Sequence, residues 1–150
     1  MKSKYFDERQ LQIRGEIFFH GLVTAIALLL VNAFLLGNNI VWASGFHQNI
    51  LIIMLTGTVV IIEAIFRDAF FGMGQMRWPI IGAFGVISLV LLFFCVSRII
   101  QGAALIENGE LTVNGYLSFY TTMPVSITVA GIIMEINEKK KKCELEAEID

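Results

Sequence analysis

Four long apolar stretches, separated by short polar breaks, constrain this chain more than any other feature of its sequence. They cover residues 17–36, 50–71, 80–100 and 116–134. Each is close to the ~20 residues that a helix needs to cross a hydrocarbon layer of ~30 Å. Apolar residues make up 56% of the chain, which leaves too little polar surface for a soluble domain. The sequence therefore predicts an all-α, polytopic membrane protein with four transmembrane helices.

The domain organisation follows from where these stretches end. Residues 1–136 are expected to form one four-helix transmembrane domain, and residues 137–150 a charged cytosolic tail, NEKKKKCELEAEID. Glu138 and Lys142 have the favourable i,i+4 spacing. We therefore expect the last span to continue into the tail as a solvated helix.

The distribution of Lys and Arg predicts the orientation of the spans, because basic residues in short loops favour the cytoplasmic side. The loop over residues 37–49 contains no basic residue, and Arg98 alone borders the loop after the third span. The remaining ten of the eleven basic residues lie before the first span, between the second and third spans, and in the tail: Lys2, Lys4, Arg9, Arg14, Arg67, Arg77 and Lys139 to Lys142. Both termini are thus expected in the cytoplasm, with the protein multi-pass in the plasma membrane.

The residues before the first span predict a helix start. Asp7 is placed to act as N-cap, and Gln10 stands three residues later, where its side chain reaches back in a capping box. Phe6 and Leu11 occupy the two positions of a hydrophobic staple. We interpret this segment as a short cytosolic helix that runs into the first span; a docking site for a cytosolic partner is the alternative.

Small and polar residues fall on helical stripes in two spans. In the first span the stripe consists of Gly21, Ala25, Leu28 and Asn32. Small residues at this spacing let helices approach closely in lipid. In the fourth span the stripe consists of Ser118, Thr122 and Ser126. Helix packing and local hydrogen bonding explain this stripe, and a helix that lines a substrate path is the alternative.

Two local signals interrupt the regular pattern near the end of the chain. Pro124 lies in the middle of the fourth span and frees the backbone carbonyl of Tyr120, which predicts a kink. Between the third and fourth spans, Asn108-Gly109 is flanked by β-prone residues, which predicts a β-hairpin in that loop.

Ionisable groups near the membrane are candidate functional groups, because charge is costly in hydrocarbon. The candidate polar cluster consists of Glu16, His20, Glu63, Arg67 and Asp68. The first span leaves the cytoplasm and the second returns to it, so all five are expected at the cytoplasmic leaflet. Glu63 and Arg67 are i,i+4 and can pair directly, with Glu63 about 6 Å deeper. We interpret this pair as a structural ion pair; an ion or substrate site and simple snorkelling of the side chains to the interface are the alternatives.

The sequence contains no HExxH, no paired Cys/His spacing, no GxSxG and no Walker loop. It also lacks the basic and aromatic surface that nucleic acid requires. We therefore expect no catalytic, cofactor or metal site; an intramembrane acid-base site of Glu16, His20 and Glu63 is the enzymatic alternative. His20 is expected to be a hydrogen-bonded group at the interface, and His47 shows no partner in the sequence.

The segment DERQLQIRG at residues 7–15, the four spans and the Lys/Glu-rich tail together resemble a group of small uncharacterised membrane proteins of Gram-positive bacteria. These proteins have four helices and an N-terminal DER-type motif, and they belong to families of unknown function. The resemblance covers most of the chain in layout and implies a bacterial plasma-membrane location. It supplies no catalytic or binding residues.

These observations predict a non-enzymatic accessory or regulatory membrane subunit that acts through a partner. The expected partners are the lipid bilayer and either a second copy of the chain or a membrane or cytosolic protein. The alternative is a small transporter or channel that uses a cytoplasmic-leaflet polar site around Glu63. A continuous proton relay is disfavoured, because the ionisable groups gather at one end of the spans.

Overall fold

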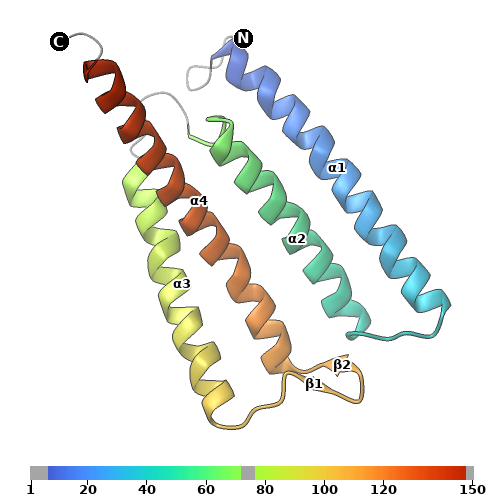
Figure 1. The fold of residues 1–150 in the computed structure, drawn as a ribbon. Coiled ribbons are helices and arrows are strands. Elements are labelled where there is room, and N and C mark those ends of the chain that lie inside the picture. Colours follow the sequence, from blue (N-terminus) through green and yellow to red (C-terminus); the bar gives the residue numbers. More distant parts are fainter. Residues whose placement is uncertain (1–6, 72–76, 148–150) are drawn as a thin grey trace.

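The computed structural model describes residues 7–71 and 77–147, most of which lie in long helices (Figure 1). The elements in chain order are α1 (Glu8–Gly37), α2 (Gly45–Phe66), α3 (Arg77–Ile100), β1 (Ile106–Glu107), β2 (Glu110–Leu111) and α4 (Val113–Ala147). All four helices are long and apolar enough to cross a membrane. The prediction of an all-α chain with four span-length apolar helices is confirmed.

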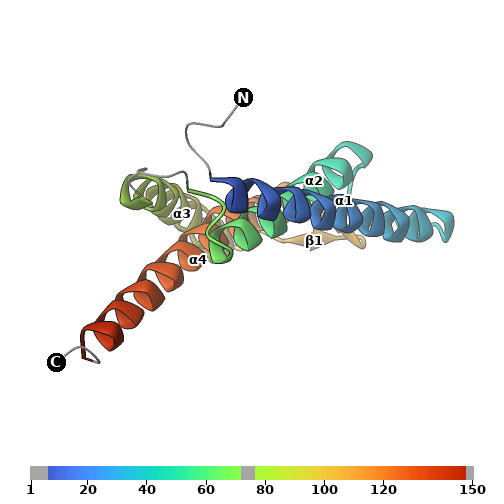
Figure 2. The ribbon, with the colours of Figure 1, turned by 90° about the horizontal axis from the view of Figure 1, so that it is seen from above.

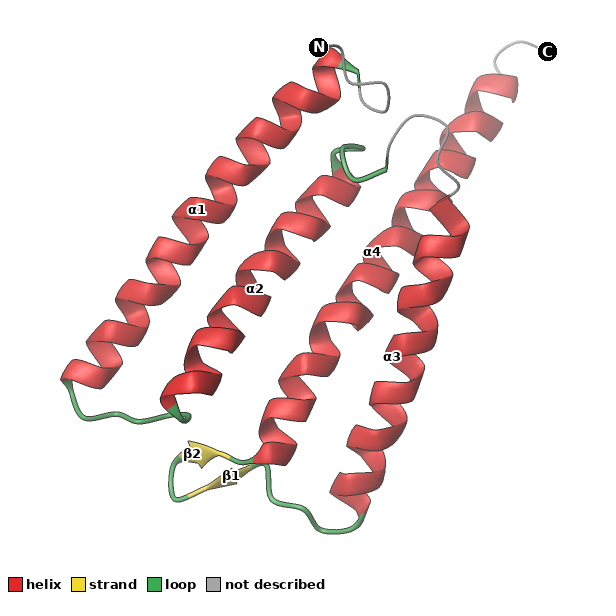
Figure 3. Cartoon of the chain, turned by 180° about the vertical axis from the view of Figure 1, so that it is seen from behind, coloured by secondary structure: helices red, strands yellow, loops and turns green. Residues whose placement is uncertain are grey.

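The helices lie side by side in one open layer and do not close into a bundle. Contacts join α1 to α2, α2 to α4 and α4 to α3, so the order across the layer is α1–α2–α4–α3 (Figure 3). The view from above shows the C-terminal part of α4 leaving this layer (Figure 2). The N-terminal start of α1 and the C-terminal end of α4 lie at the same end, called here the terminal end (Figure 1).

The packed core lies toward the terminal end, where α2, α3 and α4 meet. Its buried members are Ile65, Phe71, Ile81, Ile127, Ala130 and Met134. A smaller cluster under α1 contains Ile17, Ala64 and Ala69. Because α1 contacts one neighbouring helix, only 6% of its most apolar window is buried, and its remaining apolar surface is left for lipid or another protein.

The start of α1 follows the predicted capping box. The Asp7 carboxylate accepts from the Gln10 backbone N–H at 2.6 Å, and the Gln10 side chain accepts from the Asp7 backbone N–H at 3.4 Å. Leu11 is described, but its predicted staple partner Phe6 lies outside the described residues. The helix then continues into the first predicted span without a break.

The predicted stripe of small residues on α1 faces α2. Gly21 is buried, and a Cβ built on it would lie 2.5 Å from Cγ2 of Val60. A side chain at residue 21 would therefore clash with the Val60 side chain at the present separation of the two helices. Gly21 adjoins His20 in the chain, and Val60 lies about one turn before Glu63 on α2, so this contact lies next to the ionisable groups.

The second helix ends earlier than the predicted span over residues 50–71. It stops at Phe66, Arg67 is its C-cap, and Asp68 has a φ of 54°. The N–H groups of Ala69 and Phe70 both donate to the Ala64 carbonyl, so the chain folds back on the end of the helix. The apolar residues 69–71 are thus packed against the core in a loop. The predicted span included them because hydrophobicity does not distinguish a buried loop from a helix.

The fourth helix runs from the loop side of the layer into the tail as one element, as predicted. Pro124 lies inside it without ending it. Two members of the predicted hydroxyl stripe bond to carbonyls of the same helix: Ser118 donates to Asn114 at 3.0 Å and Thr122 to Phe119 at 2.6 Å. This is the local hydrogen bonding favoured from the sequence. The Ser118 hydroxyl also lies 3.1 Å from the Cys95 sulfur of α3.

The predicted hairpin is present between α3 and α4. Ile106 pairs with Leu111 and Glu107 with Glu110, while Asn108 and Gly109 both have positive φ, at 52° and 85°. Positive φ at both central residues is the geometry of a tight hairpin turn that matches strand twist. The hairpin is tied to the layer by the Leu111 N–H, which donates to the carbonyl of Trp42 at 2.9 Å.

Candidate functional site

Four of the five candidate residues meet across α1 and α2 at the terminal end. The Nδ1 atom of His20 lies 2.8 Å from Oε1 of Glu63. The same carboxylate oxygen accepts from Arg67 at 3.2 Å, and Arg67 also donates to Glu16 at 2.5 Å. We call these residues, Glu16, His20, Glu63 and Arg67, the α1–α2 network. The predicted i,i+4 pair of Glu63 and Arg67 is therefore confirmed.

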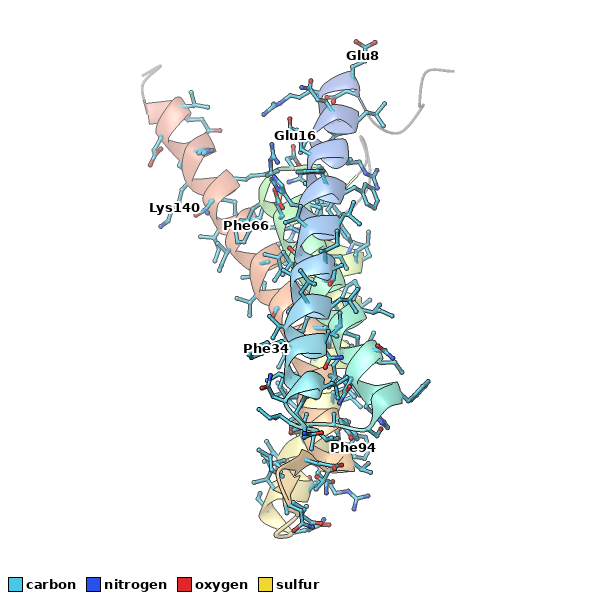
Figure 4. All side chains as sticks on the ribbon, turned by 90° about the vertical axis from the view of Figure 1, so that its right-hand side faces the viewer. Glu8, Glu16, Phe34, Phe66, Phe94 and Lys140 are labelled. Carbon is cyan, nitrogen blue, oxygen red and sulfur yellow. The ribbon has the colours of Figure 1, made fainter. Side chains whose placement is uncertain are left out.

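Exposure differs strongly within the α1–α2 network. The Glu63 side chain is 24% exposed, whereas that of His20 is 53% exposed. Glu16 lies on α1 toward the terminal end (Figure 4). Two carboxylates face one guanidinium, so the network carries one negative charge when His20 is neutral and none when His20 is protonated. Hydrogen bonds to Glu16 and Glu63 raise the pKa of Arg67 above its usual value, which keeps the guanidinium charged.

Asp68, the fifth candidate, does not join this network. Its carboxylate accepts from Arg77 at 2.9 Å. Arg77 also pairs with Glu138 and lies 3.9 Å from Glu135, both on α4, and its guanidinium sits over the ring of Phe71. We call these residues, Asp68, Arg77, Glu135 and Glu138, the Arg77 network. The expected single cluster is corrected to two networks, because the chain reverses direction at Asp68 and turns its side chain toward α3 and α4.

Sequence reasoning did not identify Arg77 as a site residue. It was assigned to topology, although Glu135 and Glu138 stand one helical turn apart on the tail and form an acidic face. Gln10 was assigned to capping alone. Its amide also donates to the carbonyl of Asp68 at 2.8 Å and to that of Phe71 at 3.4 Å. Gln10 therefore ties the start of α1 to the loop between the two networks.

Together the two networks join all four helices at one end of the layer. The α1–α2 network connects the first two helices, and the Arg77 network connects the loop after α2 to α3 and α4. Each side chain is part-exposed, so each single ion pair contributes little on its own. A connected set of pairs holds the helix ends in one geometry, because ordering one side chain also orders its neighbours.

A separate polar cluster lies at the opposite end of α1 and α2. Asn32 accepts from the indole N–H of Trp42 at 2.8 Å and donates to buried Gln48 at 3.4 Å. Gln48 in turn donates to the Ala43 carbonyl at 2.7 Å. These amides satisfy one another where water is excluded, as buried polar groups must. Asn32, Trp42 and Gln48 thus close the connection between α1 and α2.

His47 has partners that the sequence did not reveal. It lies in the first turn of α2, where its ring stacks on Tyr116 at a centroid distance of 3.8 Å. Its Nδ1 is 2.8 Å from the Ser44 hydroxyl, and the Ser44 N–H donates to the Tyr116 hydroxyl at 3.2 Å. These contacts dock the start of α2 onto α4. An aromatic partner 69 residues away leaves no local sequence signal.

Between the two ends, most interior positions of the layer are apolar, and most of the interior hydroxyls bond within their own helix. Thr24 donates to His20, Thr58 to Met54 and Thr121 to Leu117 through backbone carbonyls. The Ser88 and Thr128 hydroxyls also meet between α3 and α4 at 3.3 Å, and the buried hydroxyl of Thr56 has no partner among the described residues. Over residues 7–71 and 77–147, no three His, Cys, Asp or Glu side chains are grouped to hold a metal ion. Among the described residues, clusters of polar side chains therefore hold the helices together at each end of the layer, and the middle is mostly apolar.

The comparisons with known proteins add no relative to this picture. No family model, no curated protein and no solved structure matches the chain. The function must therefore be argued from the geometry of the layer and of its two networks.

Proposed function

We propose that the protein is a non-enzymatic accessory or regulatory subunit of the bacterial plasma membrane, with both termini in the cytoplasm. The observation that carries the proposal is the open layer, in which α2 is the one helix that α1 packs along, apart from contacts with the loops at the two ends of α2. Helices in lipid associate through close packing, so a span-length helix with one intramolecular neighbour has free faces for another chain. The basic residues gathered at the terminal end support the cytoplasmic placement of that end.

The tail of α4 offers the matching cytosolic surface. Beyond Lys142 it carries Glu144 and Glu146 on a helix that projects out of the layer (Figure 2). The Arg77 network ends at Glu138, so the distal tail is not needed to hold the helices together. In this proposal the membrane helices position the protein and the distal tail contacts the partner.

A truncation after Lys142 tests the proposal and spares both networks and the basic anchors. The tagged full-length chain and the truncated chain are crosslinked gently in native membranes and purified in mild detergent. A stoichiometric second protein that accompanies the full-length chain and is lost on truncation supports the proposal. A chain with the order of residues 143–150 shuffled is the matched control for length and charge. If only copies of the chain itself are recovered, the accessory function is rejected.

A transporter using Glu63 is the second candidate, favoured by the direct contact of its carboxylate with a titratable imidazole in a membrane helix. The apolar middle of the layer weighs against it, because a path needs polar or water-lined positions from side to side. The test compares flux in vesicles for Glu63→Gln and for Glu110→Gln, an acid in the hairpin. Equal flux in the two variants would remove this candidate.

A further inference from the structure

A cleft opens at the terminal end because the neighbouring helices differ in length there. α2 ends at Phe66, whereas α1 begins at Glu8, beyond its own contacts with the end of α2, and α4 continues to Ala147. Phe66 lies at the base of the resulting gap between α1 and the tail of α4 (Figure 4). The cleft has a volume of ≈ 350 Å³ and is lined by all three helices: Arg9, Phe66, Arg67, Asp68, Met134, Asn137, Glu138 and Lys141.

Two cations in this cleft have no counter-charge among the described residues. Both carboxylates of the lining, on Asp68 and Glu138, are held by Arg77. Arg67 is in turn neutralised by the carboxylates of the α1–α2 network. Arg9 and Lys141 remain, and neither forms an ion pair within the part of the chain that the structure describes. They project from α1 and α4 toward the same opening, which leaves an unsatisfied positive site between them.

The apolar part of the cleft lining, called here its floor, consists of Phe66 and Met134. Phe66 is 53% exposed although it is the last residue of a span-length helix, and the other apolar lining residue, Met134, belongs to the buried core. The end of α2 marks where the chain leaves the apolar stretch, so the cleft lies at headgroup depth. A ligand that fits must therefore carry a negative group above and an apolar chain below.

We propose that this cleft binds an anionic phospholipid, with the headgroup phosphate between Arg9 and Lys141 and an acyl chain against Phe66. A guanidinium matches a phosphate with two parallel hydrogen bonds, and an ammonium adds a point charge. Basic pockets between transmembrane helices on the cytoplasmic side are suited to such headgroups. The apolar floor favours a lipid over an acidic protein segment, which would leave Phe66 uncovered. The inference rests on membrane insertion and not on the accessory function.

The test measures lipid retention by the full-length protein in mild detergent by native mass spectrometry, with phosphatidylglycerol and phosphatidylcholine titrated separately. We expect wild type to retain one phosphatidylglycerol in preference to phosphatidylcholine. Arg9→Gln combined with Lys141→Gln should weaken that binding about 30-fold, since each basic group near the surface contributes a factor of about five. The matched control combines Arg98→Gln with Lys140→Gln, which removes the same charge outside the cleft and should leave retention unchanged.

Two further arms separate the sources of the negative group. Inorganic phosphate at millimolar concentration should not displace the lipid, because it cannot cover Phe66; displacement would show a phosphate site and overturn the lipid assignment. Phe66→Ala should weaken retention of phosphatidylglycerol without changing its preference over phosphatidylcholine. If the two double charge variants lost phosphatidylglycerol equally, the lipid would be held by diffuse electrostatic attraction, and the cleft would be rejected as its binding site. If the Arg9 and Lys141 variant lost a co-purifying acidic protein and kept its phosphatidylglycerol, the lipid assignment would also be rejected.

Discussion

The close approach of α1 and α2 at Gly21 gives the sharpest test of the packing that assembles the α1–α2 network. In Gly21→Ala, the new Cβ would lie 2.5 Å from Cγ2 of Val60. Two carbon atoms are at their optimal separation at about 3.5–4.0 Å. Val60 is β-branched and has one strongly preferred rotamer in a helix, so its methyl group does not swing aside. The two helices must therefore separate by about 1 Å.

The cost follows from the contacts that this separation affects. One methyl group inserted into a packed contact costs about 1–3 kcal/mol. The separation also stretches the 2.8 Å contact of His20 with Glu63, which lies within a turn of Gly21 and Val60. We expect a loss of about 2 kcal/mol in the free energy of unfolding, which is close to a 30-fold change in the equilibrium constant, using about 1.4 kcal/mol per tenfold.

The assay is SDS-driven unfolding in mixed micelles, followed by energy transfer between fluorophores on α1 and α4. One label is placed at Gln12→Cys, which is exposed, and the other at Cys143, which is exposed and free. Cys95 is replaced by Ser in all variants to keep the labelling specific. Because the labels report helix separation, they detect loss of packing even where helix content is retained.

Two variants make the steric origin of the effect visible. Gly57→Ala is the matched control, because a Cβ on Gly57 in α2 would meet nothing within 4 Å. Val60→Ala removes the clashing methyl group. In that background, Gly21→Ala should lower the free energy of unfolding by less than about 0.5 kcal/mol, which corresponds to a coupling energy between the two positions above about 1 kcal/mol. If Gly21→Ala is as mild as Gly57→Ala, or if Val60→Ala fails to relieve it, the close-approach reasoning is refuted.

Two further predictions concern the polar clusters at the two ends of the layer. Arg67→Met leaves the carboxylates of Glu16 and Glu63 without their shared cation and should lower the unfolding midpoint slightly in the same assay, because exposed ion pairs contribute little. Adding Glu63→Gln should restore part of that loss, and a further loss on adding it would contradict the network. Trp42→Phe removes the indole donor to Asn32 and should cost about 0.6 kcal/mol, the average for a hydrogen bond in a membrane protein, whereas an unchanged unfolding midpoint would show that the bond contributes nothing.

The local features of the chain were predictable because their causes lie within a few residues. The Asp7 and Gln10 capping box and the Asn108-Gly109 turn each depend on a short segment whose geometry is set by its own side chains. The pair of Glu63 and Arg67 follows from helix periodicity alone. The stripe containing Gly21 was likewise visible, although the sequence did not indicate that Val60 would face it.

The candidate site was predicted only in part, because its partners are distant in the chain. His20 meets Glu63 across 43 residues, and Arg67 meets Glu16 across 51. Asp68 was grouped with its sequence neighbours, yet its positive φ turns it toward Arg77. Hydrophobicity extended the second span to residue 71, because it does not distinguish a buried loop from the end of a helix.

The sequence by itself determined the number of apolar helices, their approximate limits and the concentration of ionisable groups toward one end of the spans. These properties follow from side-chain hydrophobicity and from helix periodicity, which act along the chain. Only the tertiary structure decided that the helices form an open layer in the order α1–α2–α4–α3, and that Arg77 separates the acids into two networks. The choice of neighbours depends on side-chain shape and on ion pairing between remote segments. Hydrophobicity cannot make this choice, because the four apolar helices would be about equally compatible with lipid in any order.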